Sequence, residues 1–248
     1  MTVIKSSEEV AVMRKAGKIV AMILQKLKDE IRPGIKARQL DIVAAEEVKK
    51  YGARASFKGY HGYPAHLCVS INDEIVHGIP GEQTLDEGDI VSIDFGAYYR
   101  GFHGDAAVTV GVGTIPDEAQ KLLNVTENAL MFGIKAAHCG ACLGDISAAI
   151  QEYVEEKGFS VVREYCGHGI GRELHESPQV PNFGVRGKGP LLQKGMVLAL
   201  EPMVNIGDWH TRVDENKWTV HTLDNSLSAH FEHTIAIDDA EPEILTAL

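Results

Sequence analysis

The chain has 248 residues, of which 44% are hydrophobic, and a formal net charge of −11. This length suffices for one large domain or two small ones with a full core, and the acidic balance argues against nucleic-acid binding driven by bulk charge. No run of residues approaches the ~18–20 apolar positions of a membrane span, and the N-terminus has no apolar signal core. Four cysteines do not make a disulfide framework in a chain of this size. We therefore expect a cytoplasmic protein with no membrane partner and no direct nucleic-acid specificity.

The first half of the chain predicts two helices followed by strands. Ser6 and Glu9 offer a capping box, and apolar residues then repeat at steps of three and four until Pro33-Gly34. A second helical pattern runs from Leu40 to near Gly52, after which apolar runs typical of strands appear. The expected strands cover residues 67–71, 89–95 and 106–110.

The second half repeats this order. Pro116 opens a helical pattern that continues to Ile134, and a turn leads to another helix that ends near Gly158. The expected strands of this half cover residues 160–165, 196–200 and 234–237.

Two pairs of short stretches match between the halves, and each stretch carries an acid. Residues 85–94 and 192–201 align at an offset of 107, so that Asp94 and Glu201 coincide. Asp105 and Glu232 occupy similar places in a second pair of stretches. We interpret this as an internal duplication, with halves of approximately residues 1–112 and 113–248 packed as a single domain, residues 1–248. The alternative is a coincidence between apolar strands.

The four acids are predicted to converge on one cavity. Asp94 and Asp105 are equidistant from the turn between them, so a regular hairpin would place them opposite each other, flanked by small residues. A solvated surface pair is the favoured interpretation of these two acids alone. With a second such pair, however, two hairpins meeting face to face would surround one cavity. Burial of four acids requires a neutralising cation, and four carboxylates suit two divalent ions.

Histidines are the next candidates for ligands. His168 lies among three glycines, which allow a close backbone approach and a bend that would bring His175 to the same cavity. His77 lies in a similar His-Gly-Ile string. For any one of the eleven histidines, a surface or satisfied core position is the common alternative. The Gly-x-Gly-x-Gly spacing beside His168 does not fit a dinucleotide-binding loop.

These motifs together resemble the type I methionine aminopeptidases over nearly the whole chain. The matching strings include Gly-Tyr-His-Gly-Tyr-Pro at 59–64, Val-His-Gly-Ile-Pro at 76–80, Gly-Phe-His-Gly-Asp at 101–105, Cys-Gly-His-Gly-Ile-Gly-Arg at 166–172 and Phe-Glu-His-Thr at 231–234. The resemblance implies an α+β "pita-bread" fold, with two pseudo-symmetric αβ halves around a central antiparallel sheet. It also implies a methionyl aminopeptidase, which removes the N-terminal methionine from nascent proteins when the second residue is small.

By the same resemblance, two divalent metal ions would have five ligands. Asp105 and Glu232 would bridge the ions, Asp94 would bind one ion, and His168 with Glu201 would bind the other. A metal-bridged hydroxide would attack the first peptide bond, with Glu201 as the proton shuttle. This ligand set fits Co, Mn, Fe(II) or Zn and does not choose among them.

The resemblance further implies the residues that meet the substrate. His77 and His175 would contact the peptide and support catalysis, and the methionine pocket would be lined by Tyr60, His61, Tyr63, Cys68 and Trp218. Many relatives carry an aromatic residue immediately before the second of these histidines, where this chain has Leu174, which bears on the shape of the pocket. A monovalent-cation site would lie near Asn72 and Ser228.

The partner expected from the resemblance is the N-terminal peptide of nascent proteins, met by a monomeric enzyme, with the ribosome surface as a further candidate partner. Because the chain begins Met1-Thr2, we expect the enzyme to accept its own N-terminus.

Three alternatives stay open. A prolidase or an aminopeptidase P shares the five ligands but usually has an extra N-terminal domain, for which a first helix that starts by residue 7 leaves no room. A catalytically dead relative used as a binding module would have lost ligands, whereas all five positions are filled. A purely structural metal protein would not need His77 and His175.

Overall fold

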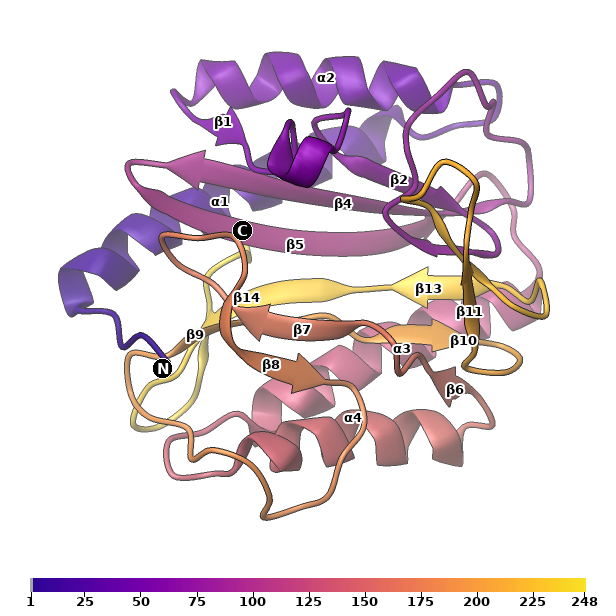
Figure 1. Cartoon of the computed structure of the whole chain (residues 1–248). Coiled ribbons are helices and arrows are strands. Elements are labelled where there is room, and N and C mark those ends of the chain that lie inside the picture. The colour runs from indigo at the N-terminus through magenta and orange to yellow at the C-terminus, as the bar shows by residue number, and fades with distance from the viewer. Residues whose placement is uncertain (1) are drawn as a thin grey trace.

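The structure, a computed structural model, describes residues 2–248. Met1, whose removal we expect, lies outside these residues. The described chain forms four α-helices and a large sheet that runs through both halves (Figure 1).

The helices come in two pairs, one from each half of the chain. The Ser6–Glu9 capping box is present, and Ser6 Oγ accepts a hydrogen bond from the Glu9 N–H at 3.3 Å. Pro116 stands at the N-cap of the third helix, as predicted. The four helices are α1 Ser7–Glu30, α2 Ala37–Lys50, α3 Asp117–Ala136 and α4 Leu143–Glu156. These predictions are confirmed, and no helix between residues 2 and 248 has the length and apolar character that crossing a membrane requires.

The large sheet has the strand order β1-β4-β5-β14-β9-β7-β8, with β2 paired to β4 and β15 to β14. Its strands pair antiparallel throughout. Their bounds are β1 Arg54–Ala55, β2 Cys68–Ile71, β4 Ile90–Tyr99, β5 Phe102–Gly111, β7 Cys166–Gly169, β8 Glu176–Pro181, β9 Val197–Leu200, β14 Glu232–Ala236 and β15 Glu243–Ile244.

Two small sheets lie beside the large one, in the orders β13-β10-β6 and β11-β12-β3. Their strands are β3 Glu74–Val76, β6 Ser160–Val161, β10 Met203–Asn205, β11 Thr211–Val213, β12 Val220–Thr222 and β13 Ser228–His230, and a short 3₁₀ helix, η1, covers Tyr60–Gly62. The strand predicted over residues 160–165 is therefore wrong in extent. It pairs with β10 only over Ser160 and Val161, because the chain then bends at the exposed Arg163 and Glu164. The other predicted strands are present with shifted ends.

The two halves repeat the same local connection. The Gly34 N–H donates to the Leu85 carbonyl at 2.8 Å, and the Gly140 N–H donates to the Leu192 carbonyl at 2.9 Å. Both glycines have positive φ, 88° and 86°, which suits a residue without a side chain. Because one sheet also joins the halves through the β5–β14 pair, we propose that residues 1–248 form a single domain.

The helices cover one face of the large sheet and leave the other face to the site. Along β4, Ile93 and Phe95 are fully buried in the core with α1 and α2, and the intervening Asp94 points the other way. In the second half, Leu198 and Ile235 pack in the same manner in the core with α3 and α4. Alternation along the strands thus separates an apolar face from a polar one.

Helix α1 approaches its neighbours closely through one glycine. A Cβ added at Gly17 would lie 2.3 Å from the Leu245 carbonyl oxygen, and one added at Gly104 on β5 would lie 2.9 Å from the Gly17 nitrogen. Real Cβ atoms do not come this near to backbone atoms, so any side chain here forces the helix and the sheet apart.

We predict that Gly17→Ala lowers the free energy of unfolding by about 1–3 kcal/mol, because the clash outweighs the ~1 kcal/mol that alanine gains in a helix. Urea denaturation measures the change. Lys18→Ala, at the exposed neighbouring position, should change stability by less than about 0.5 kcal/mol. Equal stability of Gly17→Ala and the unmodified protein would contradict the packing described.

Candidate metal centre

Three acids lie in one row across the polar face of the sheet. Asp94 on β4 is paired with Ala107 on β5, and Ala107 is paired with Glu232 on β14. Glu201 directly follows β9, which pairs with β14, and so ends the same row. The small side chain of Ala107 leaves a hollow between Asp94 and Glu232.

The neighbouring row carries the remaining acid and a histidine. Asp105 on β5 is opposite Gly96, and its N–H donates to Thr234 Oγ1 at 3.0 Å. Thr234 pairs with Ala199, which in turn pairs with His168 on β7. Asp105 and His168 are thus separated only by small residues, and the two rows place all five predicted ligands on one face.

The register of the strands in the large sheet corrects two predictions. Asp94 and Asp105 do not lie directly opposite each other, because the hairpin turns through Arg100 and Gly101, whose φ angles of 48° and 93° suit a two-residue turn. This turn places the two acids on the same face in diagonal positions. The second correction concerns the two strand pairs, which do not meet face to face but lie edge to edge in one sheet, through the β5–β14 pairing.

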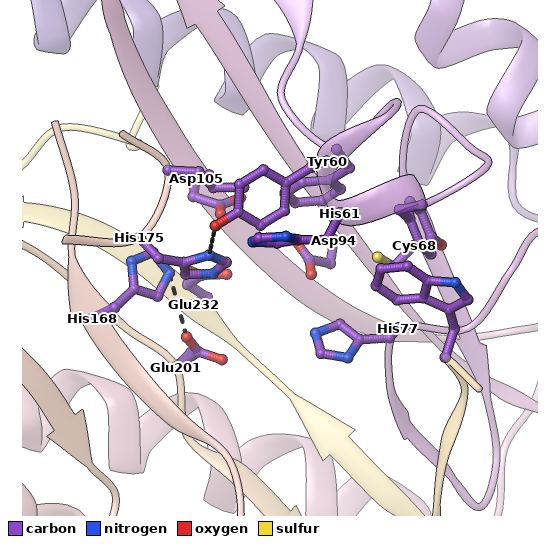
Figure 2. A pocket seen from close by; sticks show the side chains of 14 residues that line it. Tyr60, His61, Cys68, His77, Asp94, Asp105, His168, His175, Glu201 and Glu232 are labelled. Atoms are coloured by element: carbon purple, nitrogen blue, oxygen red, sulfur yellow. Dashed lines mark hydrogen bonds and ion pairs between the residues drawn. The ribbon is translucent and has the colours of Figure 1, made fainter. Parts of the chain in front are cut away.

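A cavity of about 260 Å³ opens over these rows. Figure 2 shows the acids and His168 at its base, with Tyr60, His61, His77 and His175 around them. All twelve residues predicted from the sequence line it: Tyr60, His61, Tyr63, Cys68, His77, Asp94, Asp105, His168, His175, Glu201, Trp218 and Glu232. The structure therefore brings these twelve residues together, while their individual roles stay predictions.

The unpartnered oxygens at the base fit a divalent cation. Asp94 Oδ1, Asp105 Oδ1 and Glu232 Oε1 are buried and have no hydrogen-bond partner among residues 2–248. One ligand atom from each of Asp105, His168 and Glu232 can be chosen so that all lie within 4.8 Å of one another. Buried acceptors without donors are costly, and a metal ion is the group that satisfies several of them at once.

Burial and mutual repulsion raise the pKa values of the acids. Burial raises the pKa of Asp94 to about 7. For Asp105 and Glu232, burial and then the neighbouring carboxylates raise the pKa well above the ordinary value. Burial and the Asp94 carboxylate do the same for Glu201. Without a cation, the cluster therefore holds protons near neutral pH.

His168 is prepared to bind a metal through Nε2. Its Nδ1 donates to the Gly169 carbonyl at 2.8 Å, which leaves Nε2 with a free lone pair. Nε2 lies 3.6 Å from Glu201 Oε1 (Figure 2). Burial, followed by the nearby His175, lowers the pKa of His168 to about 3, so the ring is neutral at neutral pH.

The other two histidines stand at the rim of the cavity. Burial lowers the pKa of His77 to about 4 and also lowers that of His175. The Tyr60 hydroxyl and His175 Nδ1 form a hydrogen bond of 2.7 Å, and the rings of His168 and His175 are 4.2 Å apart. Both rim histidines are neutral at neutral pH and can donate through an N–H group.

The expected methionine pocket is built from aromatic rings beside Cys68. The rings of Tyr63 and Trp218 meet edge-on at 5.1 Å. The Tyr63 hydroxyl donates to the Gly78 carbonyl at 2.8 Å and thereby fixes the segment that carries His77. Cys68 is buried and pairs with Asp94 across β2 and β4, so this pocket adjoins the acids.

A buried ion pair holds the loop that carries His175. Lys5 Nζ lies 2.6 Å from Glu176 Oε2, with side chains only 2% and 10% exposed. Glu176 Oε1 accepts hydrogen bonds from the N–H groups of Arg172 and Glu173, at 2.8 and 3.3 Å. The segment before α1 therefore fixes the position of this loop.

Asn72 and Ser228, expected near a monovalent cation, are in contact. The Ser228 N–H donates to the Asn72 carbonyl at 2.9 Å. The Asn72 side chain bonds with Asp89 and the Ile90 N–H. The cation site itself stays a prediction.

Two residues at the site were not predicted from the sequence. Phe57 lines the cavity, as does Leu174, which was expected to shape the pocket, and His230 lies behind it, 3.9 Å from Glu201. Strand alternation was a usable signal for His230, because it precedes Glu232 by two positions and so shares its side of the chain.

Comparison with known proteins shows which sequences and structures the chain resembles. The sequence pattern of metallopeptidase family M24 matches residues 11–239. A methionine aminopeptidase from Clostridium perfringens is 52% identical over 248 residues, which cover 100% of both chains.

Solved structures agree. A methionine aminopeptidase from Thermotoga maritima superposes with a TM-score of 0.99 at 49% identity, covering 100% of both chains. An Xaa-Pro dipeptidase from Bacillus anthracis has a TM-score of 0.78 at 24% identity, over 99% of this chain and 62% of that one, a likeness of fold alone. The expected fold of two αβ halves around an antiparallel sheet is confirmed.

We predict that Lys5→Met lowers the free energy of unfolding by about 3–5 kcal/mol, because it leaves the buried Glu176 carboxylate without its cation. Chemical denaturation measures this loss. Lys194→Met is the matched control, since Lys194 pairs with Asp238 and Asp239 in solvent and should matter little. Equal losses of stability in the two variants would contradict the stabilising role of the Lys5–Glu176 ion pair.

We predict that metal binding releases protons. Near pH 7 the acids retain protons, since their pKa values are raised, to about 7 for Asp94, and a cation must displace these protons. Affinity for Mn²⁺ should therefore rise from pH 6 to pH 8. Calorimetric titration of metal-free protein at pH 6.5, in two buffers of different ionisation enthalpy, counts the protons; identical heats in both would refute the prediction.

Proposed function

Because the chain belongs to metallopeptidase family M24, we propose that its cavity removes the N-terminal methionine from polypeptides whose second residue is small. The observation that carries this proposal is one cavity that combines four acids and His168, all candidate metal ligands, with two rim histidines and an aromatic pocket. Relatives near 50% identity over the full chain bear the name methionine aminopeptidase. The chain is accordingly a metal-dependent peptidase that acts at chain ends.

The proposed metal ligands are Asp94, Asp105, His168, Glu201 and Glu232, which hold two divalent ions. Glu232 stands between Asp94 and Glu201 in its row, and the family resemblance assigns Glu232 and Asp105 to both ions. When bound, such ions lower the pKa of a coordinated water toward neutrality and polarise the scissile carbonyl. Four carboxylates and one imidazole fit Co, Mn, Fe(II) or Zn alike.

Three residues are proposed to handle protons and charge during cleavage. Glu201 is suited to take a proton from the attacking water and to deliver it to the leaving amine. His77 and His175 are neutral, as their lowered pKa values imply, so each can donate a hydrogen bond through an N–H group without carrying charge. His175, beside His168, suits the developing oxyanion, and His77 suits the peptide nitrogen.

The pocket beside the acids is proposed to hold the methionine side chain. Tyr60, His61, Tyr63, Cys68 and Trp218 supply aromatic edges and a buried thiol, and a thioether packs favourably against aromatic rings. Tyr63 is fixed by two backbone carbonyls, of Leu67 and Gly78, so the pocket is formed in advance. Leu174, buried at its wall, contributes apolar surface where many relatives have an aromatic ring.

The proposed partner is the N-terminal peptide of nascent proteins, met in the cytoplasm by a monomeric enzyme. The ribosome surface and a monovalent cation near Asn72 and Ser228 stay proposals of the same kind. Net charge of −11 disfavours extensive nucleic-acid contact through bulk charge.

Hydrolysis of Met-Ala-Ser, compared with Leu-Ala-Ser and Ala-Pro-Ala, tests the function in metal-stripped protein refilled with Mn²⁺ or Co²⁺. We expect release of methionine only, and only with metal. Asp105→Asn should reduce the rate by more than the ~10–100-fold that loss of an outer-shell partner costs. The exposed Asp239→Asn is the matched control and should leave the rate unchanged. Cleavage of the proline peptide would indicate an aminopeptidase P, and no turnover with metal bound would indicate a binding module.

A further inference from the structure

His230 is a buried histidine that is fixed in place by its backbone. It ends strand β13 and is 2% exposed. Its N–H donates to Thr109 Oγ1 at 2.8 Å, and the same hydroxyl donates to the His230 carbonyl at 2.8 Å. Thr109 also bonds to Ser92 at 2.8 Å. The β4–β5 hairpin thus determines where the imidazole stands.

The imidazole points an unused nitrogen toward Glu201. Nε2 is buried, and no residue from 2 to 248 supplies it with a hydrogen-bond partner. It lies 3.9 Å from Glu201 Oε2, while Oε1 of the same carboxylate lies 3.6 Å from His168 Nε2. Oε1 of Glu201 therefore faces the proposed ligand His168, and Oε2 faces His230.

An unpartnered buried nitrogen costs stability, and the Glu201 carboxylate, 3.9 Å away, can accept a hydrogen bond from it. A neutral imidazole carries its proton on one of its two ring nitrogens, so Nε2–H can act as the donor. His230 is not among the described residues that line the cavity. Its Nε2 is therefore placed to bond with Glu201 and not with a substrate in the cavity.

We propose that His230 is a positioning residue for the metal centre. Its Nε2–H donates to Glu201 Oε2 when metal is bound and keeps Oε1 directed at the ion that Glu201 shares with His168. Outer-shell donors of this kind orient ligating carboxylates and raise metal affinity. The inference rests on the proposed metal ligands, but it assigns a role to a residue that touches neither the metal nor the substrate.

Metal affinity, measured without any substrate, tests this role. His230→Leu keeps the apolar bulk but removes the donor, and should weaken Mn²⁺ binding by about 10–100-fold in calorimetric titration. His230→Gln can place its amide nitrogen near the position of Nε2 and should restore affinity to within about threefold, below the range of an outer-shell loss. The visible spectrum of the Co²⁺-loaded protein should change in the Leu variant and return toward the original in the Gln variant.

His233→Leu is the matched control. His233 is a half-buried histidine of the same region, but its Nδ1 bonds to Thr246 Oγ1 at 2.8 Å, away from the acids. This substitution should leave Mn²⁺ affinity unchanged even if it lowers the melting temperature.

A second measurement needs no variant. In protein labelled with ¹⁵N-histidine, addition of diamagnetic Zn²⁺ should shift the His230 Nε2 resonance to that of a hydrogen-bonded, exchange-protected N–H. An unshifted resonance, or unchanged metal affinity in His230→Leu, would overturn the proposal. A raised KM with unchanged metal affinity would instead assign His230 to the substrate. If Met-Ala-Ser is not hydrolysed but His230→Leu still weakens metal binding, the proposed function fails and this inference stands.

Discussion

The repulsion among four buried carboxylates is the constraint on which the rest of this structure depends. Asp94, Asp105, Glu201 and Glu232 share one face of one sheet, and their raised pKa values show that the folded chain alone does not stabilise their charges. Every arrangement around them serves to keep that face open for a cation. Small residues stand between the acids, and the four helices cover the opposite face.

The contacts that hold the side chains around the cavity mostly join residues far apart in the sequence, and they make the site rigid. Lys5 reaches the loop of His175 across the chain, Tyr63 fixes the segment of His77, and Thr109 fixes His230. Each contact positions a side chain that stands at or behind the cavity. A catalytic group held by packing and hydrogen bonds loses little freedom when substrate binds, which favours reaction over mere association.

Much of this architecture could be predicted from local sequence. Helix caps and apolar spacing predict all four helices, and the internal repeat singles out the four acids. The register of the first hairpin escaped prediction because its turn uses Arg100 in a positive-φ conformation, where glycine or asparagine is the usual signal. The β5–β14 pairing and the Lys5–Glu176 ion pair join residues more than a hundred positions apart, and no local pattern reports such contacts.

Strand β14 has a central place in the sheet but comes late in the chain. It lies between β5 and β9 and carries Glu232, so the active centre cannot assemble until residues up to 236 have been synthesised and have paired with strands made long before. A growing copy therefore has no activity until this strand has joined the sheet. If the enzyme accepts its own N-terminus, as the sequence leads us to expect, that processing is a reaction between molecules, in which a finished copy acts on a younger one.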